Sequence, residues 1–175
     1  NVIKLSTKVE KRVHEIENER ILSVGFIGSE GDKFEKELLS QRKNTAKARK
    51  DFNSFINNFD SSIYDKQFNS LLNKSKLQLK KIKINRVKVI DLDLSAINTI
   101  AYYSSINEPL LNLVGNIAKT SVEPELSLQL TAYLNFLLAK ESAAIEGSIG
   151  TKVLEIDKFE KGMNEKFRDL ISGQK

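Results

Sequence analysis

The stretch of sequence that decides the fold is residues 5–28, which read LSTKVEKRVHEIENERILSVGFIG. Its apolar residues recur at intervals of three and four, at Leu5, Val9, Val13, Ile16, Val24 and Ile27. This spacing places the side chains on one face of an α-helix. The face has one gap, at position 20, which is filled by an arginine. Gly28 and Gly31 follow and predict the end of this helix.

The rest of the chain also predicts long helices. Its 175 residues contain only 8 glycines and 2 prolines, whereas a β-sandwich or barrel needs a turn about every 8–12 residues. Asp32 and Glu35 have the spacing of an N-cap and its capping-box partner. Further helices are expected over residues 34–59, 63–79, 95–120, 124–150 and 159–171, with Pro109 kinking the third of these. The predicted fold class is therefore all-α, with long antiparallel helices forming one or more bundles in a single domain over residues 1–175.

Residues 77–90 are ambiguous. Their apolar residues include alternating stretches that would suit a strand. No other segment offers a clear partner strand, so we expect the end of a helix followed by a loop.

The composition excludes several classes of chemistry. The chain has no cysteine and a single histidine, His14, so thiol catalysis, disulfides and zinc sites built on Cys or His pairs are excluded. No pair of residues makes a convincing acid–base couple, so we expect neither an enzyme nor a metal site nor a cofactor. No apolar run approaches the ~18 residues of a membrane span. Because the chain begins at Asn1, we expect a fragment of a longer protein.

Arg20 is the most informative residue, because a guanidinium on a core-facing stripe must find an acceptor. One interpretation is that its donors hold a planar anion. The other is a structural ion pair, for which Glu141 is the candidate partner, because it lies on the apolar stripe of its own helix. If Glu141 neutralises Arg20, no ligand is required. If both belong to a larger polar pocket, Glu141 would orient Arg20 and leave donors free.

Positive charge is concentrated in the first half of the chain. The densest cluster of basic residues is Lys74, Lys76, Lys80, Lys81, Lys83, Arg86 and Lys88. No aromatic residues are interleaved there for base stacking. We therefore expect a solvated face directed toward the acidic second half, with no nucleic-acid partner. Gly25, Gly28 and Gly31 lack the spacing of a dinucleotide-binding fingerprint and are interpreted as helix-ending glycines.

The sequence around Arg20 resembles a known family. Residues 13–29, VHEIENERILSVGFIGS, are similar to the opening of the nitrate- and nitrite-sensing (NIT) domain of bacterial chemoreceptors and sensor kinases. The resemblance continues at AYY (101–103), VEPEL (122–126) and KESAAIE (140–146). It implies an all-helical sensor that binds nitrate, nitrite or another small anion or polar ligand between helices and signals by helix movement.

The resemblance also implies a site and a setting. Arg20 matches the first of the family's two anion-binding arginines, whereas Gly147 occupies the position of the second. Losing that contact removes ~1.5–3 kcal/mol of binding free energy, unless Lys140, Lys152 or a partner subunit supplies the lost charge. Tyr103, Glu141 and Ser148 are further candidates for the ligand site.

By analogy we expect the periplasmic part of a membrane-anchored chemotaxis receptor that acts as a homodimer. The alternative is a ligand-free helical module that transmits signals by packing alone.

Overall fold

The structure, a computed structural model, describes residues 2–62, 64–156 and 162–173. In that part of the chain there are helices and turns but no strand, so the all-α prediction is confirmed. The helices are α1 (Val2–Gly28), α2 (Glu35–Asn57), α3 (Lys66–Lys80), α4 (Ile82–Ile90), α5 (Ala96–Thr120), α6 (Pro124–Ile156) and α7 (Met163–Ser172).

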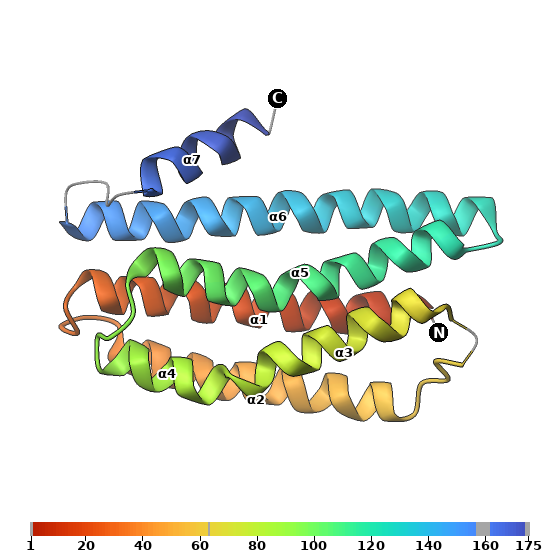
Figure 1. The fold of residues 1–175 in the computed structure, drawn as a ribbon, viewed down its shortest axis with the longest axis horizontal. Helices are drawn as coiled ribbons and strands as arrows, with labels where there is room; N and C mark the ends of the chain where they lie inside the picture. The colour runs from red at the N-terminus through yellow and green to blue at the C-terminus, as the bar shows by residue number, and fades with distance from the viewer. Residues whose placement is uncertain (1, 63, 157–161, 174–175) are drawn as a thin grey trace.

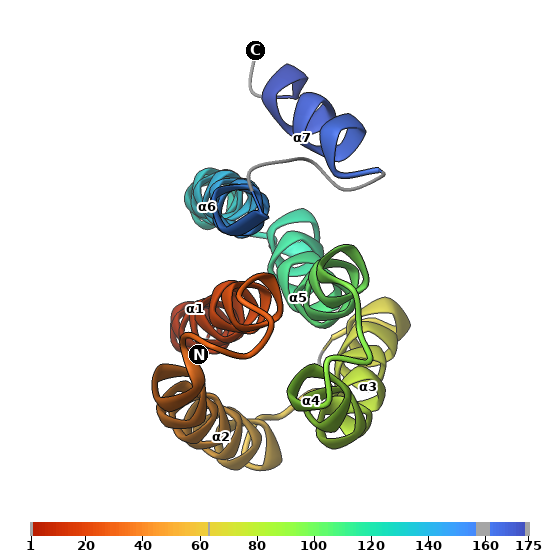
Figure 2. The same ribbon diagram turned by 90° about the vertical axis from the view of Figure 1, so that its left-hand side faces the viewer.

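Helix α1 lies at the centre of the bundle (Figure 1). It packs against α2, α5 and α6, and it also touches α4. Viewed end-on, α2 and the α3–α4 pair lie on one side of α1 and α5, and α6 lies on the other (Figure 2). Helix α7 touches α6 on its outer side.

The apolar stripe of α1 explains this central position. Leu5, Val9, Val13, Ile16 and Val24 are each at most 1% exposed. Arg20, which fills the gap in the stripe, is 0% exposed. A helix buried on several sides must place any polar group opposite a partner, so α1 determines where the charged residues of its neighbours lie.

The turn after α1 differs from the predicted capping box. Helix α2 begins at Glu35, and its N-cap residue is Phe34, in the left-handed conformation with φ 71° and no side-chain cap. The prediction of Asp32 as the N-cap is wrong. The hydroxyl of Ser29 instead accepts a hydrogen bond from the backbone N–H of Lys33 at 3.0 Å.

Two of the three glycines in this region end the helix, and the third does not. Gly28 is the last residue of α1, and Gly31 has φ +88°, which favours glycine. Gly25 lies inside the helix. A Cβ atom there would come within 2.9 Å of the Phe34 ring, so Gly25 is needed for close packing rather than for helix termination.

The expectation of a loop after residue 79 is also wrong. Residues 82–90 form α4, because their apolar side chains follow a helical rather than an alternating pattern of burial. Ile82 and Val89 are buried, whereas Ile84 and Val87 are more than half exposed.

The remaining helix boundaries are close to those predicted. Ser95 caps α5 by accepting from Asn98 N at 3.2 Å, and α5 continues through Pro109. Helix α6 runs past the predicted end at residue 150 to Ile156. The predicted start of the last helix, Phe159, lies outside the described residues.

The packing of Gly25 predicts that Gly25→Ala destabilises the protein. Forcing a methyl group against the partly buried Phe34 ring is expected to cost ~1–3 kcal/mol, the usual range for overpacking. Gly150→Ala is the matched control, because a Cβ atom at this position of α6 would meet nothing within 4 Å, and alanine favours a helix by up to ~1 kcal/mol over glycine. Urea denaturation of both variants checks this, and equal stabilities would contradict it.

Candidate functional site

Two consecutive, oppositely charged residues of α1 are completely buried. Glu19 and Arg20 are each 0% exposed. Consecutive residues of an α-helix point about 100° apart, so the two side chains face different neighbours. Each therefore requires its own partner of opposite charge.

Arg20 meets α6 and α5. Its guanidinium donates to both carboxylate oxygens of Glu141, Nη1 to Oε1 at 2.7 Å and Nη2 to Oε2 at 3.1 Å. Nη1 also donates to Ser104 Oγ at 2.9 Å, and Asn107 Nδ2 donates to Glu141 Oε2 at 3.1 Å. The pairing considered from the sequence is thus present, within a larger polar cluster.

This cluster retains unused hydrogen-bonding capacity. Arg20 Nε and Asn107 Oδ1 are buried without a partner among the described residues. An open groove of about 410 Å³ is lined by Ser104, Glu141 and Lys166, among others. Two of these, Ser104 and Glu141, accept hydrogen bonds from Arg20 directly, so the groove reaches the side chains that hold the arginine.

A second acidic residue adjoins the cluster. Glu17, 2% exposed, lies 3.4 Å from Lys140 Nζ through its Oε2. Burial first, and then the neighbouring Glu141, raise the pKa of Glu17, although Lys140 and Arg20 oppose the shift. Burial, and then the positive charge of Arg20, lower the pKa of Lys166. Lys166 is therefore close enough to Arg20 to interact with it electrostatically.

Glu19 forms a separate cluster on another side of α1, between α4 and α5. Arg86 of α4 binds it through two hydrogen bonds of 2.7 Å, from Nε to Oε1 and from Nη2 to Oε2. Tyr103 OH donates to Glu19 Oε1 at 2.9 Å, and Ser23 Oγ donates to Tyr103 OH at 3.3 Å. Burial, and then the charge of Glu19, raise the pKa of Tyr103.

The Glu19–Arg86 pair corrects the interpretation of the basic cluster. Arg86 was expected on a solvated face, but its side chain is only 20% exposed and is bound to the core. Lys74 does follow the expectation, because it lies at the surface 3.6 Å from Glu108 of the acidic half. The sequence pattern does not single out Glu19, because this residue falls beside the apolar stripe and not in it.

The four predicted site residues do not all meet. Arg20 and Glu141 are in contact, whereas Tyr103 binds Glu19. Ser148 is buried, and its hydroxyl donates to the Ala144 carbonyl oxygen within α6 at 2.8 Å. Gly147, at the expected position of the second arginine, is exposed, with open space at its Cβ position. Gly147 is not among the residues that line the groove next to Ser104 and Glu141.

The fold and these buried charges define an all-helical bundle with an arginine-centred polar cluster between its helices. The family model described as nitrate and nitrite sensing matches residues 11–175. The chain belongs to this family, as the sequence resemblance implied.

One solved structure, that of the NasR transcription antiterminator, matches the fold with a TM-score of 0.90 and 20% sequence identity. The match covers 97% of this chain and 46% of the antiterminator chain. No curated protein sequence gives a significant match.

The comparison corrects the expected setting. The sequence suggested the periplasmic part of a membrane receptor, but the solved structure that matches this fold is a transcription antiterminator. The periplasmic assignment is therefore wrong. None of the helices, over the residues searched, combines the length and apolarity needed to span a membrane.

The contact between Arg20 and Glu141 predicts strong energetic coupling. Removing one partner of a buried ion pair typically costs ~3–5 kcal/mol, because the other charge is left uncompensated. We expect Arg20→Met and Glu141→Gln each to show such a loss in urea denaturation, and the double variant to lose much less than the sum. The exposed pair Lys74–Glu108 is the control, with an expected coupling of ~0.2–1 kcal/mol. Additive losses for Arg20 and Glu141 would contradict the structure.

The raised pKa of Glu17 predicts a pH dependence. Between its unfolded and folded pKa values, the folded protein binds a proton that the unfolded chain has lost. The free energy of unfolding therefore falls as the pH rises through that interval. Glu17→Gln removes this dependence, so the variant should gain stability relative to wild type between pH 4 and pH 8. Urea denaturation across this range checks it, with the exposed Glu125→Gln as a control. If the difference in free energy of unfolding between Glu17→Gln and wild type does not change with pH, the prediction is contradicted.

Proposed function

We propose that this chain is a ligand-sensing domain that binds nitrate, nitrite or a closely similar small anion at Arg20, between α1, α5 and α6. Membership of the nitrate and nitrite sensing family supports the choice of ligand. The observation that carries the proposal is the buried guanidinium of Arg20. Its Nε–H has no partner among the described residues, and its hydrogen-bond partners Ser104 and Glu141 line a groove. A sensing role of this kind requires no catalytic group.

The balance of charge around Arg20 favours an anion. Three basic groups, Arg20, Lys140 and Lys166, surround two acidic groups, Glu17 and Glu141. The raised pKa of Glu17 reduces the negative charge further when it takes up a proton. A planar oxyanion can accept hydrogen bonds from a guanidinium in the same way as the carboxylate of Glu141 does.

The same contacts provide a route for signalling. Helix α6 is bound to α1 through Arg20–Glu141 and through Lys140–Glu17. An anion that takes donors of Arg20 from Glu141 weakens the first contact and changes the charge next to the second. Helix α6 would then shift relative to α1, as a change in population between two packings.

A second candidate function is a ligand-free module that transmits signals by helix packing. One observation favours it, because Glu141 already neutralises Arg20 through two hydrogen bonds. The two functions differ in what happens when Glu141 loses its charge. A competing anion would then bind more tightly, whereas a ligand-free module would only lose stability.

This proposal changes the expected roles of Tyr103 and Ser148, whereas homodimerisation stays a prediction. In this proposal Tyr103 and Ser148 are not direct ligands, because both hydroxyls donate to other groups; they support the helices that carry the site. Homodimerisation, which the resemblance implies, is tested by sedimentation velocity on the isolated chain.

Nitrate titration of wild type, Arg20→Met and Glu141→Gln tests the proposed site. At 100 times its dissociation constant a ligand adds about 2.7 kcal/mol, which raises the melting temperature by roughly 5–10 °C for this size. We expect this shift in wild type, none in Arg20→Met, and a dissociation constant about tenfold lower in Glu141→Gln, where no carboxylate competes for the guanidinium.

Arg12→Met is the matched control, because Arg12 is an equally buried arginine of α1 outside this cluster. It should keep the nitrate response. No response to nitrate in wild type and Glu141→Gln alike, at constant ionic strength, would reject the sensor and favour the ligand-free module.

A further inference from the structure

Arg12 is a buried cation without a counter-charge among the described residues. It lies on α1 two turns before Arg20 and is 1% exposed. None of its three guanidinium nitrogens has a hydrogen-bond partner in the described part of the chain. Its Cζ lies 4.5 Å from the centroid of the Phe52 ring. The cation–π contact stabilises part of the positive charge. It accepts no hydrogen bond, however, from the N–H groups, which point outward in the guanidinium plane.

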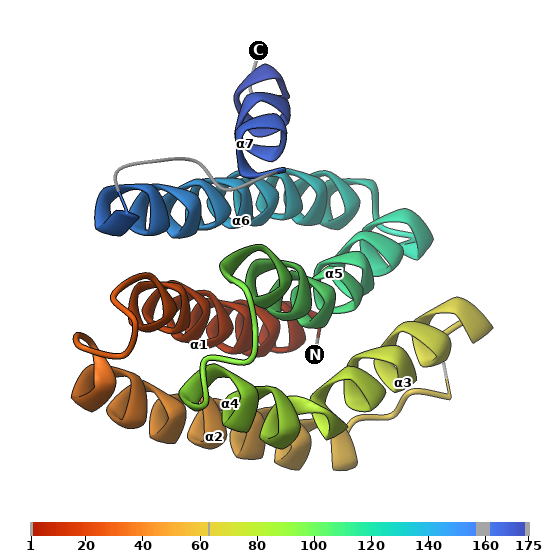
Figure 3. The same ribbon diagram turned by 60° about the vertical axis from the view of Figure 1, so that its left-hand side comes forward.

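A wide cleft lies next to Arg12. Helices α2 and α3 have almost no direct contact, and the ribbon diverges between them (Figure 3). The cleft between these helices has a volume of about 710 Å³. Ala46, Arg49 and Leu79 line this cleft, and they also line the small cavity that contains Arg12. Arg12 therefore lies beneath the floor of the cleft.

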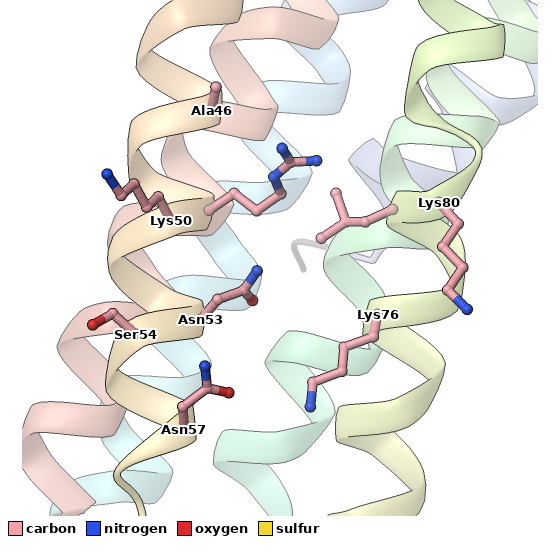
Figure 4. Close-up of a pocket in the computed structure, with 9 residues that line it drawn as sticks. Ala46, Lys50, Asn53, Ser54, Asn57, Lys76 and Lys80 are labelled. Atoms are coloured by element: carbon pink, nitrogen blue, oxygen red, sulfur yellow. The ribbon is translucent and has the colours of Figure 1, made fainter.

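The side chains of the cleft are basic and polar. Arg49, Lys50, Lys76 and Lys80 line it, and none of the described residues that line it is acidic. Lys76 extends into the gap from α3, with its amine level with Asn57 of α2, while the side chains of Lys50 and Lys80 point away from the gap (Figure 4).

The nearest carboxylate on α2 does not offset this charge. Asp51 is directed to Lys11 at 3.9 Å, outside the cleft. The charge of the cleft is thus uncompensated by the residues that line it.

The buried charge of Arg12 and the basic lining of the cleft both favour an anion at this place. Burial, followed by the nearby charge of Arg49, lowers the pKa of Arg12 to about 9. This direction shows that the surroundings disfavour its charge. An anion in the cleft would supply a counter-charge both to Arg12 beneath the floor and to the basic side chains that line the cleft.

We propose that the cleft between α2 and α3 binds a multiply charged anion of the phosphate class, with Arg49 as its direct ligand and Arg12 as the buried charge beneath it. Guanidinium groups match the geometry of phosphate oxygens. Four basic side chains spread over a cleft of this size favour several negative charges over a single one. The site is separate from the Arg20 cluster, which lies on the α5–α6 side of α1.

Calorimetric titration with pyrophosphate, at constant ionic strength, tests this site. Wild type should bind it saturably at one site. Arg49→Ala should weaken binding by about 10- to 100-fold, the usual effect of losing a charge-assisted contact. Lys47→Ala is the matched control, because it removes one exposed positive charge from α2 outside the cleft, and it should change the dissociation constant less than about twofold.

Two more variants complete the test. Arg12→Met should weaken pyrophosphate binding while melting no lower than wild type without the anion, because it removes an uncompensated buried charge. Arg20→Met, titrated at a temperature at which circular dichroism shows it to be folded, should leave pyrophosphate binding unchanged. No binding to wild type, equal weakening in Lys47→Ala and Arg49→Ala, or loss of binding in folded Arg20→Met would overturn the proposal.

Discussion

The structure depends on the two opposite charges buried side by side on α1. Glu19 and Arg20 cannot be left unpaired in the core, because an uncompensated buried charge costs several kcal/mol. Glu19 takes Arg86 of α4, and Arg20 takes Glu141 of α6. These pairs fix the rotation of α1 about its axis and the register of its neighbours, which apolar packing alone specifies less strictly.

The two pairs differ in how completely their hydrogen-bonding groups are satisfied. Both carboxylate oxygens of Glu19 are bound by Arg86, and Tyr103 adds a third hydrogen bond. Around Arg20, the Nε–H group has no partner among the described residues, and a groove reaches the hydrogen-bond partners Ser104 and Glu141. A pair whose hydrogen-bonding groups are satisfied suits a structural role. An incompletely satisfied pair next to a groove suits a position where a ligand can enter and change helix packing.

Much of the fold could be predicted from the sequence, because apolar spacing determines which helix faces are buried. The stripe of α1, its termination at Gly28 and the all-α class all follow from local pattern. The pairing of Arg20 with Glu141 could also be predicted, because each is a charged residue on the apolar stripe of its own helix. Residues 82–90 were mispredicted, because short apolar runs suit a strand or a helix equally well until the packing surface is known. The parts of the site that depend on distant contacts could not be predicted. Arg86 belongs to a run of lysines, and only the placement of α4 against α1 brings it to Glu19.

The state of the Nε–H group of Arg20 tests the central claim most directly. It can be followed by ¹H–¹⁵N spectroscopy of arginine side chains, with Arg20→Lys to assign the resonance. If Arg20 is the anion ligand, nitrate should shift this resonance to saturation, and chloride at equal ionic strength should not. A resonance that stays unmoved while nitrate binds the chain would contradict the account.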